Sequence, residues 1–360
     1  MPGSIPNGGR LFLMAGGGTG GHVIPLLAVA RELRSRGHKA IFVGTERGME
    51  ARLVPADGFE LKTIAIGGLN RVGPLQKLKT LWRLPVETFA CLRYGAAAVF
   101  SMGGYVSGPP VMAALLRRTP LVVMEPNAIA GLANRWAGHF VARALVSFDE
   151  TARYFPRGRT EVTGLPVREE FFRIAPKPRD RILRLLITGG SQGSRTLNRA
   201  ARESWDRFRG AGCPVHIVHQ TGAPDYEEIR TEFAKSGLSG EIVPFITNMP
   251  EAFAASDLII CRSGAGAVSE LAAAGRASIL VPFPFAADDH QTRNAAAMER
   301  GGAARLVRDA EFTGQKLFET VLELSSASST IDHMAEAARK FAKPGAAKRA
   351  ADILEEVART

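Results

Sequence analysis

The chain has few cysteines and no long apolar run. Its three cysteines, Cys91, Cys213 and Cys261, are odd in number and lack the spacing of metal ligands, which excludes a disulfide framework and a zinc motif. We expect reduced core thiols in a cytoplasmic protein. No apolar run reaches the roughly 18–20 residues of a membrane span, and the N-terminal segment lacks the apolar core of a signal peptide.

Acidic residues are also scarce relative to basic ones, 35 against 46, which gives a net charge of +11. The excess is uneven: residues 1–170 carry 21 basic and 12 acidic residues, whereas residues 171–360 carry 25 and 23. A basic half suits nucleic acid, anionic lipid or a phosphorylated substrate. Because the sequence has no RNA-recognition, helix-turn-helix or zinc-finger signature, we expect no nucleic-acid partner.

Short apolar runs alternate with helix-like segments along the whole chain. The expected strands span residues 11–15, 40–43, 61–66, 98–101, 121–124, 144–148, 183–188, 215–219, 241–245, 258–261 and 277–281. Such continuous apolar runs favour parallel sheets covered on both faces. Each half also opens with a strand and a Gly-rich turn. The pattern predicts an α/β fold of two Rossmann-like, doubly wound parallel-sheet domains that face a central cleft.

Three segments make up the expected domain plan. A linker rich in proline and charge near residues 168–181 separates an N-terminal domain, 1–170, from a C-terminal domain, 171–340. The last helices have no following strand. We therefore expect residues 341–360 to form a helix that crosses back to the N-terminal domain.

The segment from Cys261 to Asn294 is the most informative part of the sequence. The expected strand ends at Cys261, and a Gly-rich turn opens a helix of small residues. A helix N-terminus has free N–H groups and the positive end of a dipole, so it suits a phosphate. Glu270 lies within this apolar helix and therefore needs a hydrogen-bond donor, for which a ribose diol is one candidate. The loop 189–193 is a second phosphate cradle.

The first Gly-rich loop contains G-x-G-x-x-G at Gly16, Gly18 and Gly21. This is a weak dinucleotide signal, because Glu46 lies too far along the chain to hold a ribose. The loop is either a tight turn or an anion-binding nest. His22 is the first bulky side chain after it, and a neutral imidazole there is a candidate general base.

Polar residues also follow the strand that ends near residue 124. Glu125 is a candidate second base or a partner that orients His22, and Asn127 is a candidate donor to a sugar hydroxyl. Alternatively, both residues cap a helix that begins near residue 129. Asp288 and Asp289 suggest a metal site, but the sequence has no D-x-D pair, and a helix cap with Gln291 turned to a ligand is preferred.

The stretch from Leu69 to Tyr94 mixes leucines with cations. Positions 75, 78, 82, 86 and 89 have helical spacing and favour a core face. Leu81 and Leu84 lie off this stripe beside cations, a pattern typical of a helix that dips into an anionic membrane surface.

Taken together, these motifs resemble the MurG family of peptidoglycan glycosyltransferases. The resemblance rests on GGTGGHVIP at 17–25, GGYVSGP at 103–109, GGSQGS at 189–194 and the segment from Cys261 onward. It implies the GT-B fold and an inverting, β1→4 transfer of N-acetylglucosamine (GlcNAc). The donor would be UDP-GlcNAc and the acceptor undecaprenyl-pyrophosphoryl-MurNAc-pentapeptide, at the cytoplasmic face of the cell membrane. No cofactor or metal is required, although assistance by a divalent ion is left open.

The resemblance also implies residue roles. His22 is the first choice of general base and Glu125 the second. The implied donor-binding residues are Thr19, Gly20, Gly21, Asn127, Arg168, Ser191, Gln192, Ile246, Ala265, Gly266, Ala267, Val268, Ser269, Glu270 and Gln291. The implied residues for acceptor and membrane are Gly104, Tyr105, Leu75, Leu81, Trp82 and Leu84. The alternatives are another acceptor, a UDP-GlcNAc epimerase, an NAD(P)-dependent oxidoreductase and an inactive lipid- or nucleotide-binding protein.

Overall fold

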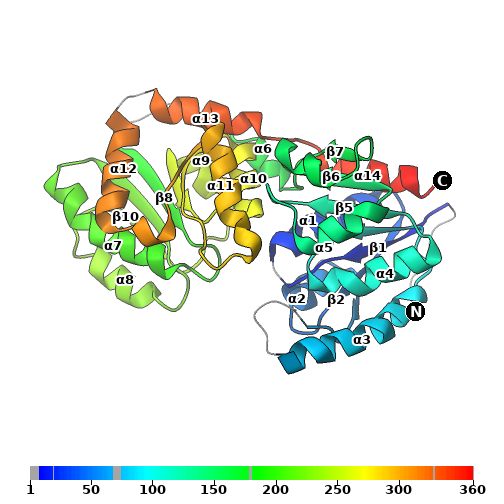
Figure 1. Cartoon of the computed structure of the whole chain (residues 1–360). Coiled ribbons are helices and arrows are strands. Elements are labelled where there is room, and N and C mark those ends of the chain that lie inside the picture. Colours follow the sequence, from blue (N-terminus) through cyan, green and yellow to red (C-terminus); the bar gives the residue numbers. More distant parts are fainter. Residues whose placement is uncertain (1–7, 19, 68–73, 178–180, 327–328, 360) are drawn as a thin grey trace. The chain divides into compact units, whose positions relative to one another are not determined.

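The chain forms two compact α/β units in the computed structural model, which describes residues 8–18, 20–67, 74–177, 181–326 and 329–359 (Figure 1). The first unit comprises Met1–Val167 with Gly345–Thr360, and the second comprises Arg168–Pro344. Each unit has its own buried apolar core. The two sheets are therefore described separately.

The first unit contains a seven-stranded sheet in the order β3-β2-β1-β4-β5-β6-β7, in which all neighbouring strands are parallel. The strands are β1 Leu11–Ala15, β2 Lys39–Gly44, β3 Glu60–Thr63, β4 Ala98–Ser101, β5 Leu121–Glu125, β6 Arg143–Val146 and β7 Thr160–Val162. The helices of the N-terminal segment are α1 Gly20–Ser35, α2 Met49–Ala56, α3 Pro74–Leu92, α4 Gly108–Arg117 and α5 Leu132–Ala137.

The second unit contains a six-stranded parallel sheet in the order β10-β9-β8-β11-β12-β13. Its strands are β8 Leu183–Thr188, β9 Val215–Gln220, β10 Ser239–Val243, β11 Leu258–Cys261, β12 Ala277–Leu280 and β13 Ala304–Leu306. Its helices are α6 Glu169–Phe172, α7 Arg195–Gly210, α8 Tyr226–Phe233, α9 Met249–Ala255, α10 Ala265–Ala274, α11 His290–Arg300, α12 Gly314–Ser326 and α13 Thr330–Lys340.

The domain boundaries differ by a few residues from those expected. The first unit ends at Val167 rather than at residue 170, because α6 belongs to the second unit: the ring of Phe171 packs 5.1 Å from that of Phe253. The returning segment begins at Gly345 rather than at residue 341. It forms α14, Ala346–Val357, which packs against α1 in the first unit (Figure 1).

Most expected strands appear within two or three residues of their predicted bounds, but β7 and β13 were missed. Both have only three residues, too short for a clear apolar run. The predicted strand 241–245 lies instead at 239–243, where Gly240 lets the backbone approach Ile217 closely. The helix expected near residue 129 begins at Leu132.

Candidate active site

The candidate site of the first unit lies at the carboxyl edge of its sheet. The strand order reverses between β1 and β4, and ligands of open α/β sheets bind at such switch points. The two loops that leave these strands are both Gly-rich, at residues 16–18 and 102–104. Glu125, at the end of β5, brings a third loop to the same edge.

His22 lies between the two Gly-rich loops. It is half-buried in the first turn of α1, and its Nδ1 lies 3.3 Å from the carbonyl oxygen of Gly17. A Cβ added at Gly104, which has φ +77°, would lie 3.5 Å from His22 Cε1. If Nδ1 carries the proton and donates it to Gly17, Nε2 has the lone pair that a general base needs. Because a carbonyl oxygen can only accept, the contact with Gly17 favours the tautomer that has its proton on Nδ1.

The first Gly-rich loop binds a carboxylate of the chain itself. The N–H of Gly18 donates to Glu50 Oε2 at 2.8 Å. Glu46, the acidic residue weighed in the sequence, is exposed, whereas Glu50 is fully buried. Sequence reasoning missed Glu50, because nothing in the local pattern Gly48-Met49-Glu50 marks a buried carboxylate. Thr19 lies outside the described residues; Gly20 and Gly21 form the first turn of α1.

Glu125 is a structural centre of its own loop. Its Oε1 accepts hydrogen bonds from the N–H and Nδ2 of Asn127, and its Oε2 accepts from the N–H of Gly131 and Nδ2 of Asn134, all at 3.0 Å. Burial raises the pKa of Glu125, and these hydrogen bonds offset only part of the effect. A carboxylate with both oxygens engaged in this way fixes the loop that presents Asn127. This arrangement favours His22 over Glu125 as the base.

The second unit has its own switch point, between β8 and β11. The loop after β8 exposes Ser191 and Gln192, as a ligand-binding role requires. Gly193 is needed there, because its φ is +73° and an added Cβ would collide with the carbonyl oxygen of Thr221. The loop is thus held rigidly against the end of β9.

Arg262 ties together three loops of the second unit, and sequence reasoning did not single it out. Its Nη2 donates to Ser194 Oγ at 2.8 Å, while its Nη1 donates to the carbonyl oxygens of Val281 and Pro282 and pairs with Asp309. Ser194 is in turn the N-cap of α7. A planar guanidinium with this many fixed acceptors is a rigid brace.

Helix α10 begins directly after β11, as the sequence predicted for the segment 265–270. Its N-cap, Gly264, provides no side-chain cap, so the first-turn N–H groups of Ala265, Gly266 and Ala267 point out of the helix end. Val268 differs from this expectation, because its side chain is buried and its N–H donates to the Gly264 carbonyl. Ser269 is half-buried one residue farther on.

Glu270 has an environment unlike that of a core residue. Its side chain is 28% exposed, and Arg168 Nη2 lies 3.9 Å from its Oε1. Among the described residues, none donates a hydrogen bond to the carboxylate. Burial raises its pKa to about 7, and the charge of Arg168 opposes that shift. The hydrogen-bond donor expected for Glu270 is thus not found among the described residues, and Arg168 is its cation at 3.9 Å. The carboxylate is left able to accept hydrogen bonds from ligand hydroxyls.

Gln291 is fixed by hydrogen bonds that orient its amide. Its side-chain oxygen Oε1 accepts a hydrogen bond from the N–H of Phe283 at 2.9 Å. Its backbone carbonyl oxygen accepts another from Ser263 Oγ. Its Nε2 lies 3.9 Å from the position of a Cβ on Gly264, so the donor end is beside the start of α10. The backbone N–H of Ile246, another of the implied donor-binding residues, donates to Gln220 Oε1 at 2.8 Å.

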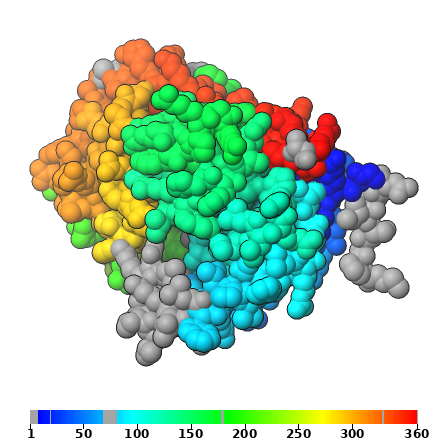
Figure 2. All heavy atoms as spheres, turned by 45° about the vertical axis from the view of Figure 1, so that its right-hand side comes forward, coloured from blue at the N-terminus to red at the C-terminus, as the bar shows by residue number. Residues whose placement is uncertain are grey.

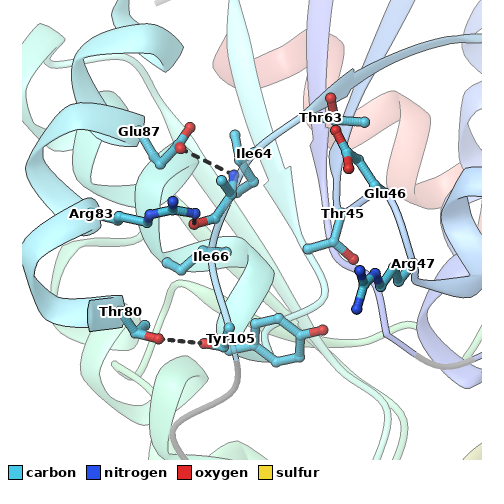
Figure 3. A pocket seen from close by; sticks show the side chains of 12 residues that line it. Thr45, Glu46, Arg47, Thr63, Ile64, Ile66, Thr80, Arg83, Glu87 and Tyr105 are labelled. Carbon is cyan, nitrogen blue, oxygen red and sulfur yellow. Dashed lines mark hydrogen bonds between the residues drawn. The ribbon is translucent and has the colours of Figure 1, made fainter. Parts of the chain in front are cut away.

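A pocket of about 550 Å³ opens in the first unit beside the second Gly-rich loop (Figure 3). Its wall includes Tyr105, Thr80 and Arg83, and it also includes Thr45 at the end of β2. Figure 3 shows Arg83 and Glu87 reaching from α3 toward the backbone that follows β3. Arg83 donates to the carbonyl oxygen of Ala65, and Glu87 accepts from its N–H.

Where its side chains are described, at positions 82, 86 and 89, the apolar stripe of α3 faces outward, which contradicts the prediction of a core face there. Trp82, Val86 and Phe89 are 77%, 66% and 67% exposed. The opposite side of the helix packs on α4, and Leu84 lies toward Gly108 there rather than outward. The side chains of Leu75 and Leu81 lie outside the described part. Figure 2 shows the surface of α3 and α4, in cyan, on one side of the first unit.

The remaining predicted features concern metals, thiols and membranes. In the described ranges, no group of three or more His, Cys, Asp or Glu side chains is placed to hold a metal ion. Asp289 accepts a hydrogen bond from Thr292 Oγ1 at the start of α11. Cys91 and Cys261 are buried and Cys213 partly so, and all three are free thiols. No helix in the described residues is long and apolar enough to cross a membrane.

Comparison with known proteins matches both units to one family. Residues 12–146 match the glycosyltransferase family 28 N-terminal domain, and residues 184–355 match the corresponding C-terminal domain. A UDP-N-acetylglucosamine–N-acetylmuramyl-(pentapeptide) pyrophosphoryl-undecaprenol N-acetylglucosamine transferase of Solibacter usitatus is 70% identical over 99% of this chain and 98% of its own. The transferase of the same name from Myxococcus xanthus is 40% identical over 95% and 91%.

Solved structures extend the comparison. MurG of Acinetobacter baumannii has a TM-score of 0.82 at 31% identity, covering 96% of this chain and 99% of its own. UDP-GlcNAc 2-epimerase of Neisseria meningitidis has a TM-score of 0.65 at 15% identity, covering 96% and 99%, and this likeness concerns the fold alone. The chain has the GT-B fold and belongs to glycosyltransferase family 28, within the group of MurG transferases.

Proposed function

We propose that this chain transfers GlcNAc from UDP-GlcNAc to the 4-hydroxyl of MurNAc in undecaprenyl-pyrophosphoryl-MurNAc-pentapeptide. The observation that carries the proposal is the 70% identity, over 99% of the chain, to a transferase named for this reaction. The product is the lipid-linked disaccharide used in peptidoglycan synthesis. An NAD(P)-dependent oxidoreductase is disfavoured, because Glu50 already holds an N–H of the loop that would bind the pyrophosphate.

The second unit binds the donor. The open N–H groups at the start of α10 suit the diphosphate, and Glu270 suits the ribose hydroxyls. Arg168 is half-exposed beside Glu270 and adds a positive charge for the leaving UDP. Ser191 and Gln192 are exposed on the neighbouring loop, and Gln291 presents its amide beside Gly264.

His22 of the first unit removes the proton from the acceptor hydroxyl. With Nδ1–H held by the Gly17 carbonyl, Nε2 accepts that proton as the oxygen attacks the anomeric carbon. A single in-line displacement inverts the configuration, so the α-linked donor gives a β1→4 link. The N-terminus of α10 and Arg168 stabilise the negative charge on the departing UDP. The reaction therefore needs no metal ion for this purpose.

The outward face of α3 holds the enzyme at an anionic membrane surface, where the acceptor resides. Trp82, Val86 and Phe89 provide the apolar contact, and Leu116 of α4 is likewise exposed. The basic excess of residues 1–170 attracts anionic headgroups, at about 1 kcal/mol for each cation near the surface. The pocket beside Tyr105 and α3 supports acceptor binding by the first unit.

The test is transfer of radiolabelled GlcNAc from the UDP sugar to a short-chain analogue of the lipid acceptor, with EDTA present. We expect a β1→4-linked disaccharide on the lipid, formed without added metal. If UDP-GlcNAc bound by calorimetry but no product formed with or without Mg²⁺, the proposed acceptor would be wrong.

A further inference from the structure

The Glu50 carboxylate is enclosed by the first Gly-rich loop and its neighbours. Besides Gly18, it accepts hydrogen bonds from Thr45: both the N–H and Oγ1 of Thr45 donate to Oε1, at 2.9 and 2.8 Å. Each carboxylate oxygen therefore has its own donors. Burial raises the pKa of Glu50, but these hydrogen bonds outweigh burial and lower it overall, so the group is ionised at neutral pH.

Three glycines leave the room that this carboxylate occupies. A Cβ added at Gly17 would lie 2.5 Å from Oε1, and one at Gly44 or Gly48 would lie even closer to the Glu50 side chain. Gly48 has φ −78° and ψ 169°, angles that any residue adopts. Its lack of a side chain is thus explained by space and not by backbone conformation. The surroundings are built around the carboxylate.

One peptide group joins Glu50 to His22. The Gly18 N–H that donates to Glu50 and the Gly17 carbonyl that faces His22 Nδ1 belong to the same peptide unit. In a trans peptide these two groups point in opposite directions. The Glu50 carboxylate therefore lies at the N–H edge of this peptide group, and the His22 imidazole lies at its opposite, C=O edge. A negative charge at the N–H also polarises the carbonyl and strengthens the bond that it accepts.

We propose that Glu50 is a positioning residue for His22, acting through the Gly17–Gly18 peptide. It fixes the orientation of that peptide, so that the carbonyl holds His22 with the proton on Nδ1 and the lone pair on Nε2. It also supplies the anion that the Gly-rich loop needs. Its kinetic consequence rests on the proposed function, whereas the tautomer of His22 does not.

The test replaces Glu50 by Gln, a side chain of the same size with only one oxygen. This single oxygen cannot accept hydrogen bonds from both Thr45 and Gly18. The NH₂ group of Gln would face one of these two donors, and two donors cannot form a hydrogen bond with each other. We expect kcat to fall at least tenfold at saturating donor, while the donor KM stays within twofold. The ¹⁵N shifts of His22, identified by its missing signal in His22→Ala, should show loss of the single Nδ1–H tautomer. Glu356→Gln, an exposed acid on α14 of the same unit, is the matched control.

A second variant guards against misfolding. In Gly48→Ala, the added methyl displaces the carboxylate while the backbone angles remain acceptable, so the same loss of kcat and of tautomer is expected. Both variants should melt cooperatively within a few degrees of the parent. If a folded Glu50→Gln variant kept the parent kcat and tautomer, the inference would be overturned. A proportional loss of kcat and donor binding would also overturn it, because Glu50 would then merely stabilise the fold. If the parent transferred no GlcNAc, only the proposed function would fail.

Discussion

Individual residues divide the work between the two units. His22 has a carbonyl at Nδ1 and a Gly-rich loop on each side, which suits one proton transfer. Glu270 has a cation at long range and no described hydrogen-bond donor, which suits hydroxyl recognition. The two side chains therefore have different kinetic signatures.

Replacing His22 by Ala removes the proposed general base and changes no residue of the second unit. We expect kcat to fall by about 10²–10⁴, the usual contribution of general base catalysis, with little change in donor KM. Initial rates at varied UDP-GlcNAc concentration measure both constants. His139→Ala, an exposed histidine of the same unit, should behave as the parent does. An unchanged kcat in His22→Ala would remove His22 from this role.

Replacing Glu270 by Ala removes the proposed acceptor for the ribose hydroxyls. Leaving hydroxyl donors unpaired in a binding site costs about 1–3 kcal/mol, so the donor KM should rise by roughly 5- to 160-fold. Calorimetric titration with UDP-GlcNAc checks the same loss in binding. Glu311→Ala provides an exposed control on the same unit. Parent-like affinity in Glu270→Ala would make this carboxylate a structural group.

The raised pKa of Glu270 also predicts a pH dependence of stability. Its folded pKa of about 7 lies above the usual value of 4.5 for a glutamate, so the folded state holds the proton more tightly between these values. Stability from this group is therefore complete below pH 4.5 and is lost as the pH rises through 7, by up to about 3 kcal/mol. Urea unfolding of the parent and of Glu270→Gln at pH 5 and pH 8 measures the difference. Equal differences at both pH values would refute the shift.

At the scale of single elements, α3 shows where sequence patterns mislead. Positions 82, 86 and 89 do lie on one face of the helix, as their spacing predicted. Periodicity does not reveal, however, whether that face meets the protein core or lies on the surface. The reverse side of α3 packs on α4, and Thr88 and Cys91 of α3 are buried. A surface apolar face is typical of a membrane-contacting helix.

A double change on α3 tests the membrane contact. Trp82→Asp with Phe89→Asp places two charges on the outward face and should reduce binding to vesicles of anionic phospholipid at least tenfold. Vesicle co-sedimentation at fixed ionic strength measures this, with Ile182→Asp of the second unit as the control for an exposed apolar residue. Transfer to a water-soluble acceptor analogue should stay near the parent rate. Undiminished vesicle binding would show that another surface makes the contact.

Much of the fold was predictable because its strands are continuous apolar runs and its loops are Gly-rich. The start of α10 after a Gly-rich turn and the place of His22 behind the first Gly-rich loop followed from these motifs. Glu50 and Arg262 were not predictable, because their partners lie in loops distant in sequence, such as Gly18 and Ser194. The loop role of Glu125 depends likewise on three-dimensional contacts that spacing alone does not encode.

At the scale of the whole molecule, the C-terminal helix completes the first unit. Three side chains of α14 form ionic contacts with that unit: Arg349 with Glu161, and both Asp352 and Glu355 with Arg36. The exposed pairs contribute little each, so burial of apolar residues such as Leu354 dominates. The chain thus closes its first unit with its last residues.

Truncating Leu354 to Ala tests this closure. Removing a fully buried leucine side chain should destabilise the first unit by about 2–5 kcal/mol. Calorimetry of thermal unfolding measures the shift in melting temperature. The affinity for UDP-GlcNAc at low temperature should be unchanged, because the proposed donor site belongs to the second unit. Lys348→Ala, exposed on the same helix, is the control. Loss of donor affinity at unchanged stability would contradict this division.

The most direct measurement of the central claim is the ratio of UDP released to lipid-linked disaccharide formed, with and without the lipid acceptor. Our account predicts one UDP for each disaccharide and almost no UDP release without acceptor, since the nucleophile is the MurNAc hydroxyl. Release of UDP without acceptor, together with a changed configuration at C2 of the free sugar, would contradict transfer and indicate epimerase chemistry.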